Sequence, residues 1–418
     1  MSDAPKRRRV VVTGFGAITP VGLDAESTWA SLLAGKSGVG RIQAFDPSAY
    51  PSQLAGEVLD YELPDWVDAK EGRRLSRFVQ FAVSATHEAI ERAGLSIDES
   101  NAERVGVLVG TGIGSLGTTE EGCRTIREKG GTRLTPFFLP QMLPNMAAGQ
   151  VSKLFGAKAY SSTIITACAA GAQAIGEASE AIRRGAADVM LAVGTEASIC
   201  ETGLAAFCAI RALSQRNDDP QGASRPFDGE RDGLVPAEGA AALVLEELEH
   251  ARARRASIWA ELAGYGCSSD AYHMVAPDPD GRGAALAIRH ALRSSCVAPE
   301  AVSYVNAHAT STPAGDAAET RALKIALGDH AYNVPISSTK SMLGHSMGAS
   351  GAIEAVVSIL SIRDKRVHPT INQSKPDPEC DLDYVPNVAR DHQVDVVLSD
   401  SFGFGGQNVV LLLKRFTD

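Results

Sequence analysis

Short runs of apolar, β-branched residues alternate along the chain with alanine-rich stretches of helical character. Continuous apolar runs are typical of strands that are buried on both faces of a sheet. The alternation predicts an α/β fold with buried, largely parallel strands. We expect strands at 104–109, 161–166, 187–193 and 240–245, and helices at 169–184 and 246–255.

The second half of the chain repeats the order of the first at coarse grain. Strand 161–166 leads through a small-residue turn into a helix, and strand 334–338 leads through a Gly-rich turn into helix 349–363. Each half also ends in an apolar strand and a basic stretch. We therefore predict two similar halves, residues 1–255 and residues 256–418. Between these elements, the long aperiodic stretch 212–239 is expected to be functional or interfacial.

Composition excludes several classes of function. Hydrophobic residues make up 44% of the 418 and charged residues 22%, which indicates a packed globular protein. A net charge of −10 argues against a nucleic-acid partner. The sequence contains no run of 18 apolar residues, so we expect no membrane span. Seven widely spaced cysteines without a C-x-x-C pair indicate neither a disulfide framework nor a zinc site, and they fit the reduced cytoplasm. The basic segment Lys6–Arg9 is expected to be a solvated tail.

Cys168 is the strongest chemical signal in the sequence. It lies in Thr166-Ala-Cys-Ala-Ala-Gly171, where a β-branched strand gives way to a helix of small residues. The partial positive charge of a helix N-terminus favours a thiolate, and small neighbours leave room for a substrate and for backbone N–H donors. The alternative is a buried structural cysteine, the commonest fate of this residue type. The position at a strand-to-helix turn favours the nucleophile.

Two histidines lie in comparable loops. His308 follows an apolar strand within Asn306-Ala-His-Ala-Thr-Ser-Thr312, and His345 lies in a Gly-rich turn that opens a helix. Either one alone is more often structural than catalytic. Because doubly wound halves bring the ends of their strands to one crevice, we expect both histidines beside Cys168.

Three glycine-rich segments need separate interpretation. Ser401-Phe-Gly-Phe-Gly-Gly406 predicts a flexible turn that either gates a pocket or is a plain hairpin. Residues 112–117 fit G-x-G-x-x-G, but the strand and acidic residue of a dinucleotide site do not follow. Residues 344–348 fit G-x-S-x-G, but no strand runs directly into that turn. We therefore expect neither a dinucleotide site nor a serine nucleophile.

Taken together, the motifs TACAAG, NAHATSTPAGD, SSTKSMLGHSMGASGA and SDSFGFGG resemble those of the β-ketoacyl-[acyl-carrier-protein] synthases of fatty-acid synthesis, and the type II condensing enzymes most closely. The resemblance runs nearly end to end. It implies a thiolase-like fold of two duplicated halves in five layers, α-β-α-β-α, and a homodimer. It also implies decarboxylative condensation of an acyl-enzyme with malonyl carrier protein, without a metal or redox cofactor. The substrates would be carried on the phosphopantetheine arm of acyl carrier protein.

The resemblance assigns roles to individual residues. Cys168 would carry the acyl chain, and His308 and His345 would stabilise the enolate formed on loss of carbon dioxide. The backbone N–H groups of Cys168 and Phe404 would hold the tetrahedral oxyanion. The remaining implied roles are Lys340 as the active-site lysine with Glu354 as its partner, Thr310 and Thr312 as pantetheine contacts, Ile113 and Phe404 as gates of the acyl pocket, Phe138 and Phe402 as further substrate-binding residues, and Lys70, Arg73, Arg74 and Arg211 as the carrier-docking surface.

Departures from the family pattern concern the surroundings of these residues. They are Ala309, Val275, Asp400, Gln407 and the pair Ala159-Tyr160. Val275 removes one expected hydrogen bond to pantetheine, and Asp400 bears on the FGFGG loop and on chain length. A polyketide ketosynthase is the nearest alternative. A non-catalytic chain-length factor would lack the nucleophile, and a degradative thiolase would carry a second cysteine in place of Ser401-Phe-Gly-Phe-Gly.

Overall fold

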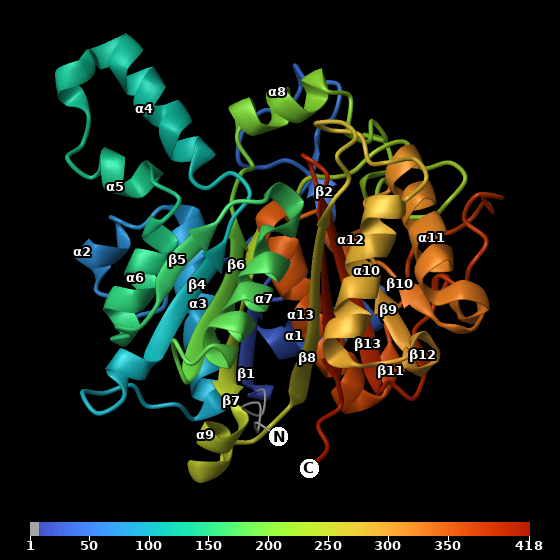
Figure 1. Ribbon diagram of the computed structural model, residues 1–418. Helices are drawn as coiled ribbons and strands as arrows, with labels where there is room; N and C mark the ends of the chain where they lie inside the picture. The colour runs from blue at the N-terminus through green and yellow to red at the C-terminus, as the bar shows by residue number, and fades with distance from the viewer. Residues whose placement is uncertain (1–7) are drawn as a thin grey trace.

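Two β-sheet halves with the same topology form the centre of the molecule. The computed structural model describes residues 8–418 and arranges ten strands in the order β10-β9-β13-β14-β8-β1-β7-β6-β4-β5 (Figure 1). Numbered along the chain within its own half, each set of five strands has the spatial order 3-2-4-5-1 from its outer edge inward. The predicted duplication is therefore confirmed at the level of strand order, while the boundary at residue 255 stays a prediction.

The strands of the first half are β1 (Val10–Ile18), β4 (Val105–Gly110), β5 (Ser161–Ile164), β6 (Val189–Glu196) and β7 (Gly239–Glu247). Those of the second are β8 (Ala260–Ser269), β9 (Tyr304–Asn306), β10 (Ile336–Ser337), β13 (Val396–Gly403) and β14 (Gln407–Lys414). Two small hairpin-like pairs lie outside them, β2 (Val39–Arg41) with β3 (Leu54–Gly56) and β11 (Arg366–Val367) with β12 (Arg390–Asp391).

The expectation of largely parallel strands is wrong for the inner part of the sheet. The outer strands pair in parallel, β5 with β4, β4 with β6, β10 with β9 and β9 with β13. The inner strands β7, β1, β8 and β14 are antiparallel to their neighbours. These inner strands are covered on both faces, so each carries the same continuous apolar run as a buried parallel strand.

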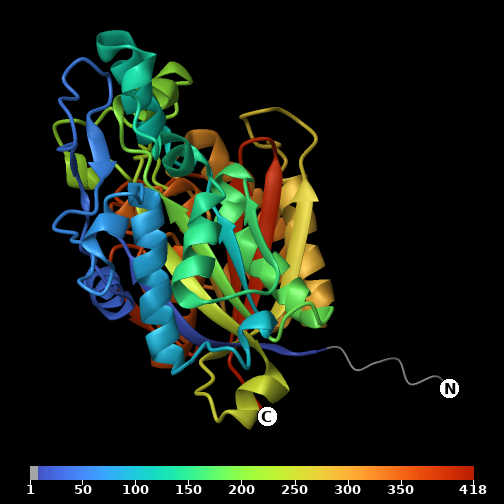
Figure 2. The ribbon, with the colours of Figure 1, turned by 90° about the vertical axis from the view of Figure 1, so that its left-hand side faces the viewer.

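Helices form three layers around and between the halves. The central layer is α7 (Ala170–Arg183) and α13 (Ser350–Asp364), which pack on each other and on strands of both halves. On the outer faces, α3 (Arg77–Ala93) and α6 (Met146–Phe155) cover the first half, and α10 (Arg282–Ser295) with α11 (Pro313–Leu327) covers the second (Figures 1 and 2). These layers confirm the expected α-β-α-β-α architecture.

The sequence of α13 matches its central place. Every residue from Ser350 to Ile362 is buried, and within this stretch every side chain except that of Glu354 is small or apolar. A helix enclosed between two sheets has no solvent face on which to place charge. Its N-terminus, like that of α7, points toward the region that contains the candidate site.

The remaining helices lie at the periphery: α1 (Ala25–Leu33), α2 (Ala69–Gly72), α4 (Leu116–Lys129), α5 (Phe138–Met142), α8 (Glu201–Ala209), α9 (Leu248–Ala253) and α12 (Lys340–Leu343). In Figure 1, α4 and α5 extend away from the layers as an arm. Within residues 8–418, every helix is too short or too polar to traverse a bilayer.

The basic N-terminal segment differs from the expected tail where it is described. Lys6 and Arg7 lie outside the described residues. Arg8 pairs with Asp188 at 3.0 Å and Arg9 with Glu261 at 2.6 Å, so these two side chains fasten the start of β1 to both halves.

Candidate active site

Cys168 lies where β5 turns into the central helix α7. The chain leaves β5 at Ile164 and forms a 3-10 turn, Ala167–Ala169, directly before α7. Ala167 has φ +49°, a conformation that costs energy for a residue with a side chain. The turn places Cys168 next to the FGFGG segment, since a Cβ added at Gly403 would lie 3.4 Å from Cys168 N. The predicted strand-to-helix position is confirmed.

The thiol of Cys168 is buried between opposing influences. Burial raises its pKa to about 12, and the charge of Glu196 acts in the same direction. The charge of Lys340 and the backbone N–H groups of Phe404 and Cys168 lower it. The sequence favoured a thiolate, whereas in the folded protein desolvation outweighs the charge of Lys340 and the backbone N–H groups and raises the pKa of the thiol. The two N–H groups expected to form the oxyanion hole do lie at the sulfur.

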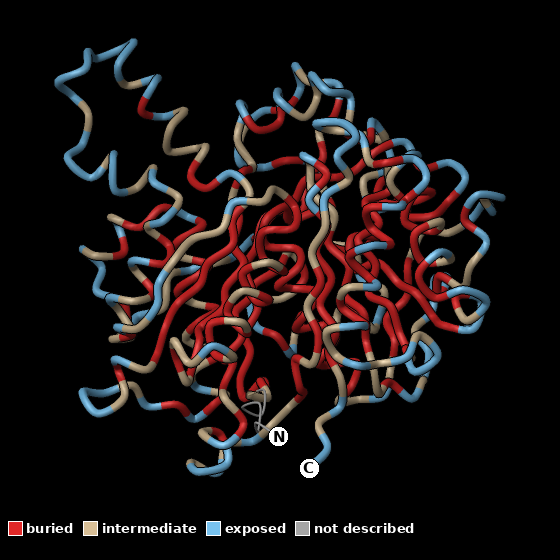
Figure 3. Tube along the Cα trace, in the orientation of Figure 1, coloured by how far each residue is buried: buried red, intermediate tan, exposed pale blue. Residues whose placement is uncertain are grey.

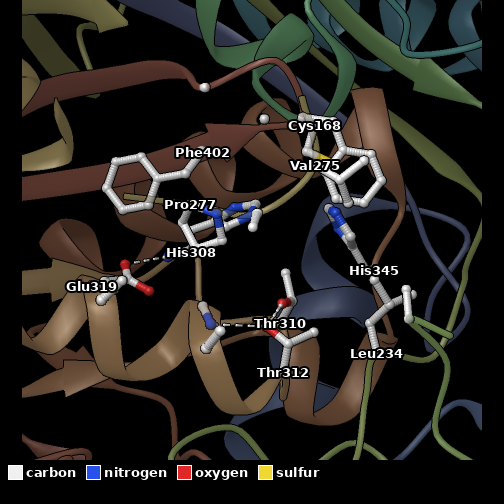
Figure 4. Close-up of a pocket in the computed structure, with 18 of the residues that line it drawn as sticks. Cys168, Leu234, Val275, Pro277, His308, Thr310, Thr312, Glu319, His345 and Phe402 are labelled. Carbon is white, nitrogen blue, oxygen red and sulfur yellow. Dashed lines mark hydrogen bonds between the residues drawn. The ribbon is translucent and has the colours of Figure 1, made fainter. Parts of the chain in front are cut away.

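His308 is placed by a carboxylate on the following helix. Its backbone N–H donates to Glu319 Oε1 at 2.8 Å, and the N–H of Ala309 donates to Glu319 Oε2 at 2.7 Å. The side chain lies edge-on to His345, with ring centroids 5.4 Å apart, and also contacts Phe402. Figure 4 shows both imidazoles directed into the space that contains Cys168.

His345 is held on the other side of that space. It follows α12, and its backbone pairs with the 212–239 segment: its N–H donates to Val235 O at 2.7 Å, and its carbonyl accepts from Ala237 N at 2.8 Å. Its Nδ1 lies 3.0 Å from Ser350 Oγ, which leaves Nε2 without a protein partner among the described residues. Nε2 is therefore the ring nitrogen available to a ligand.

Both histidines are neutral in the folded protein. Burial lowers the pKa of His308 and of His345 well below the usual value, and the nearby charge of Lys340 lowers both further. A neutral imidazole still carries one N–H, so the pair can donate hydrogen bonds without mutual repulsion. This state suits groups that meet a developing negative charge.

Lys340 and Glu354 form a buried ion pair behind the histidines. Lys340 Nζ hydrogen-bonds Glu354 Oε1, which also accepts from Thr339 Oγ1 at 3.2 Å. The side chains are only 2% and 1% exposed. The lysine therefore acts on the site through the electrostatic potential of its positive charge. The predicted partnership of these two residues is confirmed.

A single cavity joins the reactive groups to the surface. Its volume is about 340 Å³, and it extends from Cys168, His308 and His345 past Phe402 and Phe404. Most of its wall is apolar, and the hydroxyls of Thr310 and Thr312, 3.1 Å apart, are among its polar groups. The remaining lining includes Leu234, Val275 and Pro277 (Figure 4) and also Arg211 and Gly233. A narrow, mainly apolar channel with a few polar groups fits an extended flexible arm.

Asp400 differs from the asparagine usual in the resembling family. Its carboxyl is buried, and neither oxygen has a hydrogen-bond partner among residues 8–418. Burial and the charge of Glu354 raise its pKa to about 8, against the opposing charge of Lys340. A protonated aspartic acid is neutral and close in shape to asparagine, so this departure changes the local charge little at neutral pH.

Two predicted acyl-pocket residues lie outside this cavity. Ile113 is 37% exposed in the loop that follows β4, and Phe138 packs against Gly122 in the α4–α5 arm. Neither is among the residues that line the cavity in the single chain. The structure brings together Cys168, the two histidines, both threonines, Phe402 and Phe404, but not these two.

The predicted basic residues occupy two separate places. Lys70 lies in α2 and Arg73 directly after it, both exposed, while Arg74 pairs with Glu71 at 3.0 Å and covers the ring of Phe137. Arg211, with φ +55°, stands at the cavity beyond α8. Figure 1 shows α2 and α8 well apart, so on one chain the four residues form no single patch.

The sequence analysis missed two acidic residues that organise the site. Glu319 holds the His308 loop from α11, and Glu196, at the end of β6, accepts N–H groups next to Cys168. The sequence could have indicated both residues, because one is an acid inside an alanine-rich helix and the other is an acid at the end of a wholly buried strand. Buried acids of this kind are rare without a specific partner.

Comparison with known proteins agrees with this geometry. The β-ketoacyl synthase N-terminal domain matches residues 7–251, and the C-terminal domain matches residues 259–374. A relative from Synechocystis sp. named 3-oxoacyl-[acyl-carrier-protein] synthase 2 is 52% identical over 98% of this chain and 99% of its own. A relative of the same name from Coxiella burnetii is 49% identical over 99% of this chain and 100% of its own.

Solved structures give the same result at lower identity. A ketosynthase in complex with a type II PKS acyl-carrier protein superposes with TM-score 0.91 at 38% identity, over 99% of this chain and 100% of that one. A β-ketoacyl synthase from Burkholderia phymatum gives TM-score 0.91 at 38% identity, over 98% of this chain and 100% of its own. The matched domains, the near full-length relatives and the shared fold place this chain in the β-ketoacyl synthase family.

Proposed function

We propose that the protein is a 3-oxoacyl-[acyl-carrier-protein] synthase that elongates fatty acids by condensing an acyl chain on Cys168 with malonyl carrier protein. The observation that carries the proposal is the convergence of one cysteine, two neutral histidines and two backbone N–H groups on one cavity. Decarboxylative condensation requires a sulfur nucleophile and neutral donors where an enolate forms.

In the first step the acyl chain moves from the carrier to the enzyme. The sulfur of Cys168 attacks the thioester carbonyl of acyl carrier protein, and the N–H groups of Cys168 and Phe404 hold the oxyanion. The bond to the pantetheine sulfur breaks, and the proton of the Cys168 thiol passes to that leaving sulfur. Because the proton is only transferred from one thiol to another, a resting thiol with a raised pKa is compatible with the step.

In the second step malonyl carrier protein loses its carboxylate. The carbon–carbon bond to that carboxylate breaks, carbon dioxide leaves, and the electron pair forms an enolate on the thioester. His308 and His345 donate to the enolate oxygen, and Lys340 adds a stabilising positive potential from behind. A neutral donor pair can bind the neutral thioester oxygen and strengthen as its charge develops.

In the third step the enolate carbon attacks the acyl thioester on Cys168. The resulting oxyanion occupies the same two N–H groups, and its collapse expels the sulfur of Cys168, which takes a proton from solvent. The product is 3-oxoacyl carrier protein, two carbons longer. Every reactive group in this sequence is a thiol, an imidazole or a backbone amide, so the proposal includes no metal and no redox cofactor.

Acyl carrier protein is the proposed partner. The channel walls and the hydroxyls of Thr310 and Thr312 suit the amides of a phosphopantetheine arm, with Val275 contributing only an apolar contact. Lys70, Arg73 and Arg211 are exposed cations on a chain of net charge −10, as docking of an acidic carrier requires. Seven free cysteines suit a reduced compartment, and we place the reaction in the cytoplasm.

A homodimer is the proposed assembly. Strand β5 is at the outer edge of the sheet and pairs only with β4, so its other edge is open to a second strand. Beside it, Tyr160 and Ile165 are 42% and 55% exposed, and the α4–α5 arm is largely exposed (Figure 3). A second copy related by a two-fold axis would pair β5 with β5 and receive the arm. Ile113 and Phe138 would then line an acyl pocket shared between subunits.

The rival functions differ in what they do with Cys168. A polyketide ketosynthase would load and extend chains on a different carrier protein, and a chain-length factor would load nothing. The relatives at about half identity over nearly full length favour the fatty-acid enzyme. Intact-mass detection of acyl transfer from a panel of fatty-acid and polyketide carrier proteins tests the choice. Loading from fatty-acid carriers supports the proposal, and loading from polyketide carriers alone, or none, overturns it.

A further inference from the structure

Glu196 is a fully buried acid to which the proposed reaction assigns no role. It is the last residue of β6, and its carboxylate accepts hydrogen bonds from four groups. Oε2 accepts the backbone N–H of Gly112 at 2.7 Å, of Ile113 at 3.2 Å and of Gly348 at 3.2 Å. The hydroxyl of Thr111 donates to Oε1 at 3.3 Å. Three N–H groups on one oxygen form a concentrated positive field that a carboxylate satisfies best.

The donors belong to two segments that serve the site from opposite sides. Thr111 to Ile113 form the loop after β4, and Gly348 lies in the 3-10 turn Met347–Ala349 between His345 and α13. The backbones touch: a Cβ added at Gly348 would lie 2.1 Å from Gly112 N, and one added at Gly112 would lie 2.8 Å from Glu196 Oε2. The carboxylate therefore joins two chain segments where no side chain of their own can fit.

The same carboxylate acts on the nucleophile. When Glu196 is ionised, its charge raises the pKa of the Cys168 thiol, in opposition to the charge of Lys340. Burial raises the pKa of Glu196 itself to about 7 against its hydrogen bonds, so most of this group is charged at pH 8. The carbonyl of Ala167, directly before Cys168, would lie 3.4 Å from a Cβ at Gly112. Gly112 thus lies next to both Glu196 and the turn that carries the cysteine, and the charge of Glu196 acts on that cysteine.

We propose that Glu196 is a positioning residue that fixes the Ile113 loop against the 347–349 turn, so that it limits the acyl length admitted to Cys168 and, through its charge, reduces the reactivity of the resting thiol. The inference rests on the proposed function, because it assumes that an acyl chain on Cys168 extends past Ile113. It adds a specificity determinant that touches neither substrate nor cavity. Two effects follow from one group, one through its hydrogen bonds and the other through its charge.

Glu196→Gln and Glu196→Asp separate the two effects. In Glu196→Gln the amide oxygen can take the Oε2 position and the amide nitrogen can donate to Thr111, so the shape is kept and the charge is lost. Alkylation of Cys168 by iodoacetamide at pH 8 should then rise about 3- to 10-fold, the effect of a half to one unit of thiol pKa. Glu196→Asp keeps the charge and shortens the reach, so alkylation should be unchanged.

Only Glu196→Asp should loosen the Ile113 loop. The ratio of Cys168 acylation by fourteen-carbon to that by six-carbon acyl carrier protein should rise at least about threefold in Glu196→Asp, since a weaker hold lets the loop yield to the longer chain, and should stay near the wild-type ratio in Glu196→Gln. Glu57→Gln is the matched control, because Glu57 also clamps two backbone N–H groups, those of Gln43 and Ala44, outside the cavity. It should change neither readout.

The outcomes separate this inference from the proposed function. Unchanged alkylation in a folded Glu196→Gln protein overturns the electrostatic part, and an unchanged length ratio in Glu196→Asp overturns the positioning part. If Glu196→Gln does not fold, Glu196→Asp still decides the positioning part, and the inference stands or falls on it. Failure of wild-type protein to be acylated by any carrier would instead refute the proposed function, while the alkylation result would remain valid.

Discussion

Replacing Glu319 by glutamine should impair the function of His308 although the histidine itself is unchanged. Glu319 is buried in α11, and its two oxygens accept the N–H groups of His308 and Ala309 at 2.8 and 2.7 Å. An amide offers one acceptor and one donor, so one of these N–H groups would face an NH₂ group instead of an oxygen. The loop that carries His308 would then shift to relieve the unpaired donor.

The size of the effect follows from that single lost bond. Leaving one buried N–H unpaired costs about 1–3 kcal/mol. If the unpaired N–H destabilises the conformation that presents His308 to the enolate by this amount, the rate of decarboxylation of malonyl carrier protein should fall about 5- to 150-fold. Complete loss of one oxyanion donor, about 10²–10³-fold, sets the upper limit. The assay is carbon dioxide release under saturating substrate, with thermal unfolding of the same preparation.

Glu57→Gln distinguishes this reasoning from general destabilisation. Glu57 clamps the N–H groups of Gln43 and Ala44 at 2.7 and 2.9 Å in the same geometry, away from the cavity. Both variants should lose similar thermal stability, but only Glu319→Gln should lose decarboxylation. Wild-type carbon dioxide release by a Glu319→Gln protein that is as destabilised as Glu57→Gln would refute the positioning role.

Other consequences can be checked with the same materials. Because burial raises the pKa of Cys168 to about 12, its alkylation rate should rise about tenfold per pH unit from pH 7 to 9, and a plateau below pH 9 would contradict the buried thiol. Peptide mapping after incubation with acyl carrier protein should place the acyl group on Cys168 alone, and an adduct on any other cysteine would reject the nucleophile. Arg73→Glu with Arg74→Glu should raise KM for carrier-bound substrate and weaken its salt dependence, whereas equal losses with a short pantetheine thioester would mean a structural role. Ile113→Phe should reduce acylation by a fourteen-carbon but not a six-carbon carrier, and a parallel loss of both would place the length limit elsewhere.

The three candidate site residues could be predicted from sequence because each lies in a loop or turn that follows a strand. Cys168, His308 and His345 follow β5, β9 and the short strand β10 with its turn, and the repeated topology brings those ends to one place. Local chemistry and the α/β pattern sufficed for this much. The directions of the strands could not be predicted from the sequence. The antiparallel strands β7 and β14 carry the same continuous apolar runs that buried parallel strands would carry.

Residues whose roles depend on distant partners were beyond the sequence pattern. Glu196 accepts a hydrogen bond from Gly348, which lies 152 positions further along the chain, and the sequence around either residue does not predict this contact. The ionisation of Cys168 was misjudged for a related reason, because its helix-terminal position is local whereas its burial comes from other parts of the chain. Ile113 and Phe138 remain outside the cavity of a single chain, which agrees with a pocket that a second subunit completes.

The central claim is that Cys168 carries the acyl chain while the two histidines make the enolate. Cys168→Gln, His308→Ala and His345→Ala, each assayed for carbon dioxide release and for 3-oxoacyl carrier protein, test it most directly. We predict that Cys168→Gln still decarboxylates malonyl carrier protein without forming product, and that each histidine variant loses decarboxylation by about 10²–10³-fold. Undiminished carbon dioxide release by either histidine variant, or condensation by Cys168→Gln, would contradict the account.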